Sequence, residues 1–162
     1  MKKDKITKLA SMMLICFVSS VVLSQPKMPV NESLSKQIIG EWRNVFLKIT
    51  IHHQNKPTTT MEADSSNWDA RLGIKPIRTH FKEDGTYYSE YINLKDSIAK
   101  RPTGTWNIKG DSLTMNQLTP DKSSYTLHLK IDNNRATFTG VIDFDGEGIT
   151  NDEYYGIQKK FR

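Results

Sequence analysis

The densest group of acidic side chains lies near the C-terminal end of the chain. Residues 143–153 read DFDGEGITNDE, with acidic residues at alternate positions beside two glycines. Carboxylates in this spacing can wrap a hard cation such as Ca²⁺, and glycine permits the tight bend. The predicted metal ligands are Asp143, Asp145, Glu147, Asp152 and Glu153. Because these like charges repel one another within one turn, some form of charge relief is expected there.

The acidic loop departs from an EF-hand. Asp143, Asp145 and Glu147 would be its first, third and fifth ligands, with Gly148 in sixth place. The twelfth place needs a bidentate Glu, and Tyr154 stands there. Two interpretations stay open: a calcium turn of another kind between two strands, and an acidic hairpin turn in which Asp and Gly simply suit the backbone.

No other group of residues predicts catalysis. The chain has no G-x-S-x-G elbow, no H-E-x-x-H pair, no phosphate loop and no dinucleotide fingerprint. The adjacent His52 and His53 point to opposite faces of a strand, and His80 and His128 fall on the outward phase of theirs. A zinc site needs three or four convergent ligands. We therefore predict that the protein is not an enzyme and that it has no zinc site.

Aromatic residues are the remaining candidates for binding. Tyrosine offers a flat apolar body with a hydroxyl, so the tyrosines could line an amphipathic cavity, although ordinary packing inside a sheet would use them equally well. The predicted ligand-binding residues are Trp42, Trp68, Tyr88 and Trp106.

The elements that must position these residues are strands. From Gly40 onward the apolar pattern has a period of two, as in Val45, Leu47, Ile49 and Ile51. Turn pairs such as Asp84-Gly85, which predicts a two-residue hairpin, separate about eight such runs. Sequential hairpins give an antiparallel up-and-down meander, and closure into a barrel removes its exposed edges. We predict an all-β barrel able to hold one small ligand.

Three segments interrupt the strand pattern. Residues 32–39 predict a short N-terminal helix that ends at Gly40. Residues 53–76 form a long polar insertion that carries Trp68 in a pattern suited to a helical turn, and residues 93–102 form a shorter loop. Long loops at one end of a barrel often serve as lids or binding rims, and the alternative is a mobile excursion.

Gly40-Glu41-Trp42, which follows the short helix, resembles the opening signature of the lipocalin family. In that family the Trp closes the bottom of the barrel beneath a basic residue of the last strand, a place that Lys160 or Arg162 would fill. The triplet Gly104-Thr105-Trp106 and the run at residues 110–114 look like those of bacterial exported lipocalin-like domains. The resemblance covers residues 38–162 and implies a ligand cavity without naming the ligand. It lacks a good match to the family's T-D-x-x-Y motif, and no helix follows the barrel.

The N-terminal stretch predicts export. Lysines precede an apolar run at residues 9–23, and Ser24 supplies a small residue for cleavage, which is typical of a signal peptide. An uncleaved N-terminal anchor is the alternative. The only cysteine, Cys16, lies inside this run, and Ile15 before it is too large for a lipidation signal. The leader holds four lysines and one aspartate, so little of the net charge of +5 remains afterwards, and no basic stripe suggests nucleic-acid binding.

These observations predict a signal peptide at residues 1–24, a tether and short helix at 25–37, and a lipocalin-like β-barrel domain at 38–162. We expect a secreted or periplasmic monomer, without a membrane span after cleavage, that binds a small apolar or amphipathic molecule. The alternative function is a calcium-stabilised β module that contacts a protein or a surface.

Overall fold

The computed structural model describes residues 33–161. The predicted signal peptide, most of the predicted tether and Arg162 lie outside the described residues. Within the described part, no helix is both long enough and apolar enough to cross a bilayer.

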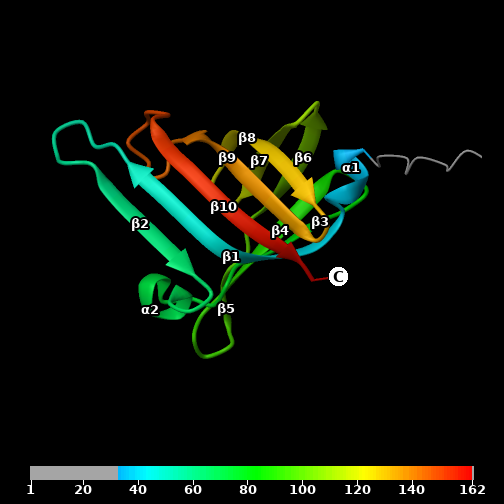
Figure 1. The fold of residues 1–162 in the computed structure, drawn as a ribbon, viewed down its shortest axis with the longest axis horizontal. Coiled ribbons are helices and arrows are strands. Elements are labelled where there is room, and N and C mark those ends of the chain that lie inside the picture. The colour runs from blue at the N-terminus through cyan, green and yellow to red at the C-terminus, as the bar shows by residue number, and fades with distance from the viewer. Residues whose placement is uncertain (1–32, 162) are drawn as a thin grey trace, which may run out of the picture. The chain divides into compact units, whose positions relative to one another are not determined.

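The described residues form an antiparallel sheet with two short helices (Figure 1). Hydrogen bonds join eight of the strands into a closed barrel in the order β1-β3-β4-β6-β7-β8-β9-β10, and β10 returns to β1. The predicted all-β barrel of largely meander order is confirmed. Its strands are β1 (Gly40–Ile51), β3 (Arg78–Phe81), β4 (Thr86–Ile92), β6 (Thr103–Lys109), β7 (Ser112–Thr119), β8 (Ser123–Asp132), β9 (Arg135–Ile142) and β10 (Asp152–Lys160).

Strand β1 pairs with two different strands along one edge and with a third along the other. One edge pairs with β10, from Trp42 opposite Lys160 to Thr50 opposite Glu153. The other edge pairs first with β3, over the stretch from Gly40, and then with a different strand, β2 (Thr59–Asp64). Figure 1 shows β2 running beside the far half of β1, away from the rest of the barrel. The wall therefore flares at one end and stays narrow at the other.

The two segments predicted as loops contain regular structure. Residues 53–76 include β2 and helix α2 (Trp68–Leu72), so the predicted helical turn is present. Residues 93–102 include a short strand, β5 (Ile98–Lys100), which pairs with β4. Trp68 is buried against Leu47, Ile49 and Ala63, and this apolar contact fixes the insertion to the barrel. The insertion is thus a packed element at the flared end.

The narrow end is closed by Trp42. Helix α1 (Leu34–Gln37) is a single turn, shorter than predicted, and the chain after it brings Ile38 beneath the barrel. The Trp42 ring is fully buried, and its Nε1 donates a hydrogen bond to the Ile38 carbonyl at 2.6 Å. Lys160 Nζ lies 5.4 Å from the ring centroid and donates to the Gln37 carbonyl at 2.9 Å. Lys160 thus fills the place that the lipocalin resemblance implied for a cation over this Trp.

Candidate functional site

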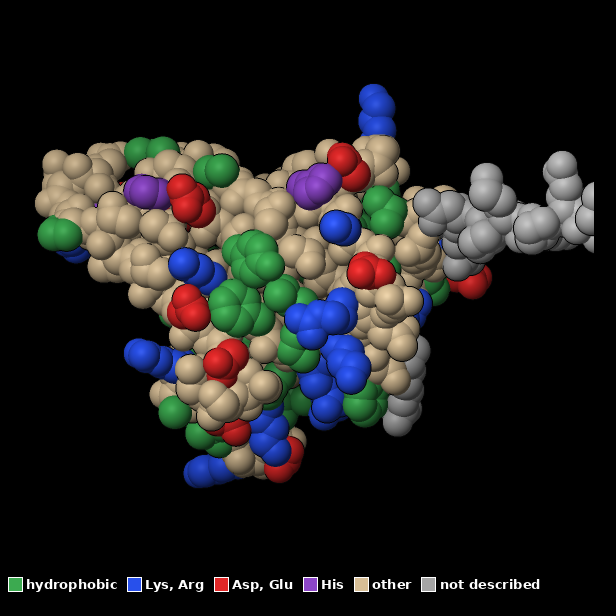
Figure 2. Space-filling model, viewed as in Figure 1, with side chains coloured by type: hydrophobic (Ala, Val, Ile, Leu, Met, Phe, Trp, Pro, Cys, Tyr) green, Lys and Arg blue, Asp and Glu red, His purple; other side chains and the backbone are tan. Residues whose placement is uncertain are grey.

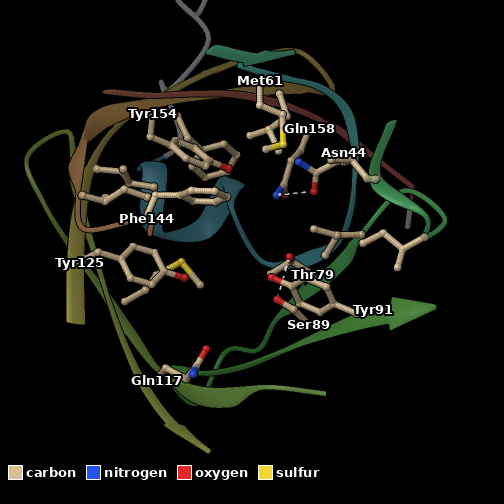
Figure 3. A pocket seen from close by; sticks show the side chains of 18 of the residues that line it. Asn44, Met61, Thr79, Ser89, Tyr91, Gln117, Tyr125, Phe144, Tyr154 and Gln158 are labelled. Atoms are coloured by element: carbon tan, nitrogen blue, oxygen red, sulfur yellow. Dashed lines mark hydrogen bonds between the residues drawn. The ribbon is translucent and has the colours of Figure 1, made fainter. Parts of the chain in front are cut away.

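A cavity of about 410 Å³ occupies the wider half of the barrel (Figure 3). Its floor consists of Phe81, Met115, Leu127 and Phe138, which belong to the buried cluster that also contains Trp42. Apolar side chains of the flared end, among them Met61 from β2, complete its upper part. This volume lies within the range of about 300–1,000 Å³ that is usual for small-molecule pockets. The barrel is therefore packed solid at its narrow end and hollow above it.

One side of the cavity carries four polar side chains, here called the polar wall: Asn44, Thr79, Ser89 and Gln158. All four are buried, and they come from β1, β3, β4 and β10. Gln158 Nε2 donates to Asn44 Oδ1 at 3.3 Å, and the hydroxyls of Thr79 and Ser89 share a hydrogen bond of 3.0 Å. Gln158 Oε1 is buried and has no hydrogen-bond partner among the described residues. A polar group in this position is available to a bound molecule.

Across the cavity lies an aromatic wall, formed by Tyr125, Phe144 and Tyr154 (Figure 3). Burial raises the pKa of Tyr125 and of Tyr154 above the ordinary tyrosine value, and it does the same for Tyr91 beside the polar wall. Because a free tyrosine already titrates near pH 10, these hydroxyls stay protonated at neutral pH. The aromatic wall thus offers flat apolar surface with neutral hydroxyls.

A β-bulge explains why Asn44 faces the cavity. Asn44 pairs with Gln158, but the next pair joins Phe46 to Ile157, so Val45 is an extra residue in β1. The bulge shifts the side-chain phase: Trp42 and Asn44 point inward before it, and Leu47 and Ile49 point inward after it. The sequence prediction continued the phase of Leu47 back to Val45 and so placed Asn44 outside. The burial expected of Trp42, two residues before Asn44, was the available signal.

None of the four predicted ligand-binding residues lines the cavity. Trp42 lies beneath the floor, and Trp106 lies in the same lower layer, where its ring edge meets Phe81 at a centroid distance of 5.8 Å. Trp106 Nε1 donates to the carbonyls of Lys82 and Thr86, which leaves it no free donor for a ligand. Trp68 packs with the α2 insertion against Leu47, Ile49 and Ala63. These tryptophans support the cavity rather than border it.

Tyr88 faces outward because its hairpin is longer than predicted. Asp84-Gly85 predicted a two-residue loop, which would set Phe81 opposite Tyr88. In the structure Phe81 pairs with Tyr87, so the loop has one more residue and Gly85 adopts a left-handed φ of 78° at its end. Tyr88 consequently stacks on His80 with ring centroids 4.2 Å apart, and the guanidinium of Arg101 lies 4.4 Å from its ring. The inward aromatic of this hairpin is Tyr87.

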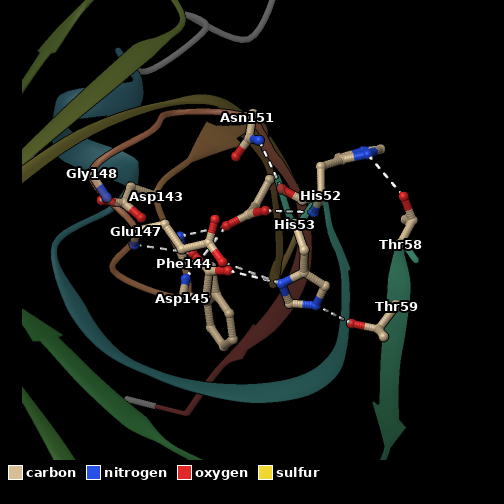
Figure 4. Close-up of polar contacts among 11 residues, drawn as sticks. His52, His53, Thr58, Thr59, Asp143, Phe144, Asp145, Glu147, Gly148 and Asn151 are labelled. Carbon is tan, nitrogen blue, oxygen red and sulfur yellow. Dashed lines mark hydrogen bonds and ion pairs between the residues drawn. The ribbon is translucent and has the colours of Figure 1, made fainter. Parts of the chain in front are cut away.

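The acidic loop gathers only part of its predicted ligand set (Figure 4). Carboxylate oxygens of Asp143, Asp145 and Asp152 lie within 4.8 Å of one another. Asp152 is fully buried and accepts hydrogen bonds from the backbone N–H groups of His52 and Phe144, each at 2.8 Å. Asp143 accepts one from Gly148 at 2.9 Å. Backbone N–H groups therefore stabilise much of the negative charge for which the sequence predicted some form of relief.

The other two predicted ligands point elsewhere. Glu147 joins Asp145 around His53, whose Nδ1 lies 3.5 Å and 3.2 Å from their respective oxygens. Glu153 faces His52 at 3.9 Å. The two adjacent histidines thus diverge, as predicted, but His53 contributes to the acidic loop, which the sequence did not indicate. The five acidic residues do not converge on one point.

Burial also shifts the titration of Asp152. Loss of solvent pushes the pKa of this carboxyl upward, but hydrogen bonds from the backbone N–H groups of His52, Phe144 and Asp145 outweigh that effect and hold the pKa below its ordinary value. Asn151 adds a side-chain hydrogen bond to the His52 carbonyl at 2.8 Å. Together these contacts fasten the loop at residues 143–151 to the end of β1, beside the aromatic wall residue Phe144.

No protein-family model matches the chain, and no curated protein is similar to it in sequence. The chemistry of the site therefore stands on geometry alone: a hollow, apolar-floored interior with neutral hydrogen-bonding groups on one side. What the structure establishes about residues 33–161 is a closed eight-stranded antiparallel β-barrel.

Proposed function

We propose that this protein binds one small apolar or amphipathic molecule inside its barrel and acts as a carrier or sequestering protein without catalysis. The observation that carries the proposal is the cavity of about 410 Å³ above a solid floor, with an aromatic wall and a polar wall facing each other. An apolar ligand would gain roughly 25 cal/mol for each Å² of surface that it removes from water. The proposal includes a monomer that works outside the cytoplasm, in keeping with the predicted signal peptide.

The direct test is native mass spectrometry of protein purified from its own source, followed by organic extraction and identification of any bound molecule. A Ser89→Phe variant fills the cavity from the polar wall, and we expect it to lose the bound mass. The matched control is Ser124→Phe, which places the same ring on an exposed position of β8. Retention of the bound mass by the filled variant would place the molecule outside the barrel and refute the proposal.

A calcium-stabilised module is the second candidate function. It is favoured by the proximity of the Asp143, Asp145 and Asp152 carboxylates. If calcium binds there, CaCl2 should raise the Tm relative to a chelator, and Asp143→Asn should abolish the difference. An identical Tm in calcium and in chelator would exclude stabilisation by calcium. The backbone N–H groups that donate to Asp152 would then account for the folded conformation of the loop.

A further inference from the structure

Polarity in the cavity is confined to neutral groups. The side chains that line it include amides, hydroxyls, thioethers and hydrocarbons, and none of the lining residues in the described part of the chain is Asp, Glu, Lys, Arg or His. Charged side chains instead lie on the outer surface, where Figure 2 shows both signs on the face in view. A ligand in the cavity would therefore meet no counter-ion.

An ionised ligand is disfavoured by this lining. Moving a carboxylate or an ammonium from water into an apolar site is costly unless an opposite charge or several hydrogen bonds receive it. The cavity tyrosines Tyr91, Tyr125 and Tyr154 are partly buried, and loss of solvent raises the pKa of each by disfavouring its anionic form. The interior thus discriminates against negative charge in the protein's own groups.

The polar wall nevertheless contains an unused acceptor. Gln158 is only 8% exposed, its Nε2 is bonded to Asn44, and its Oε1 has no partner among the described residues. Asn44 is itself committed, since it also interacts with the Tyr154 hydroxyl. Natural proteins pair nearly all buried polar atoms, with protein groups, water or ligand. The donor that satisfies this acceptor can come from water or from an O–H or N–H group of a bound molecule.

We propose that the cavity selects an uncharged amphiphile with a hydrogen-bond donor, whose O–H or N–H meets Gln158 Oε1 while its apolar body lies along the aromatic wall. The inference rests on the proposed function and deepens it by naming the ligand class. Thr79 and Ser89, on the same wall, add hydroxyls that can donate to or accept from the same polar group.

The test compares ligands of equal chain length on the wild-type protein. Decanol, decyl methyl ether, decanoate and decylammonium are titrated at neutral pH against a bound uncharged fluorescent naphthylamine probe. We expect decanol to displace the probe best. The ether, which lacks the donor, and both ions should bind roughly tenfold more weakly or worse, as expected for one lost hydrogen bond or one buried unpaired charge.

Two variants locate the donor's partner. Gln158→Met removes the free acceptor at similar volume and should erase the preference for decanol over its ether. Gln117→Met is the matched control, because this second cavity amide is only partly buried and its oxygen is not among the buried unpaired atoms of the described residues, and it should keep the preference.

These titrations distinguish a failure of the ligand class from a failure of the proposed function. If neither the naphthylamine probe nor any of the four ligands binds, the proposed function fails and the inference with it. If decanoate or decylammonium binds as tightly as decanol, the barrel binds ligands but the neutral class is wrong. An unchanged preference for decanol in Gln158→Met would overturn the assignment to Gln158, even if that class holds.

Discussion

The two halves of the barrel solve the same packing problem in opposite ways. At the narrow end, Trp42, Ile38 and Leu129 are almost wholly buried, and the indole N–H, the Lys160 ammonium and the Trp106 N–H all have partners. In the wider half the strands enclose empty volume, and Gln158 keeps a buried acceptor unpaired.

The contrast separates stability from function along one set of strands. Close packing stabilises the folded state, whereas a void within the fold reduces that stabilisation. Features that cost stability in an otherwise ordered fold are typical of functional sites. The narrow end is thus the stabilising half, and the hollow half is where a ligand would compensate for what packing leaves out.

The largest loss of stability is expected from Trp42→Ala at the narrow end. Truncation of a fully buried aromatic residue should lower the free energy of unfolding by about 3–5 kcal/mol. Phe144→Ala, at the rim of the cavity where the ring is 42% exposed, should cost less than about 1 kcal/mol. Urea denaturation of both variants provides the measurement. Equal losses would mean that the two halves contribute alike to stability.

A smaller effect is expected at Asp152, which anchors the acidic loop to β1 at the wide end. Asp152→Asn retains the shape but replaces one acceptor oxygen with a donor that faces backbone N–H groups, so we expect a loss of about 1–3 kcal/mol. The exposed Asp132→Asn on β8 serves as the control and should be close to neutral. Chemical denaturation at neutral pH measures both.

The same residue predicts a dependence on acid. Because the folded-state pKa of Asp152 is lowered, its stabilisation is complete above the unfolded pKa of about 3.9 and is lost as pH falls through the lower folded-state pKa. The free energy of unfolding of Asp152→Asn should therefore fall less than that of the wild type between about pH 5 and pH 2, the range over which the wild-type carboxyl takes up its proton. Parallel acid profiles in the two proteins would contradict the lowered pKa.

A weaker contribution is expected from Lys160 over Trp42. Lys160→Met keeps the aliphatic stem but removes the cation and the hydrogen bond to Gln37, and it should cost about 0.5–2 kcal/mol. Lys159→Met, one residue earlier on the exposed face of β10, should change stability little. Thermal melting of the pair gives the difference, and no difference would reduce Lys160 to a surface lysine.

The smallest change in stability should come from the polar wall. The double variant Asn44→Leu with Gln158→Met replaces both members of the amide pair. It removes the unpaired Gln158 oxygen and also the Asn44 amide that Gln158 Nε2 contacts, so the free energy of unfolding should shift by less than about 1 kcal/mol in either direction. Binding of decanol by the same double variant should fall. A loss of several kcal/mol would show that the polar wall supports the fold and would weaken its assignment to a ligand.

Sequence reasoning predicted the barrel because its cues are repeated along the chain: alternating apolar residues, frequent turn pairs and Trp42 after a short helix. It failed for the cavity because side-chain phase depends on single residues. The extra Val45 in β1 turned Asn44 inward, and one added residue in the loop before Thr86 turned Tyr88 outward. The pattern of β10 carried no marked apolar alternation, so the orientation of Gln158 was not predictable from its neighbours.

The pairing of β1 with β10 has a consequence for how the chain is made. Contacts such as Gln37 with Lys160 span 123 residues, and until the last strand emerges from the ribosome the first one lacks its partner along one edge. Pairing over such separations is slow to form, and open strand edges attract other chains. Newly synthesised protein is thus prone to aggregate until β10 is available to pair with β1, and removal of β10 would leave a sheet unable to close.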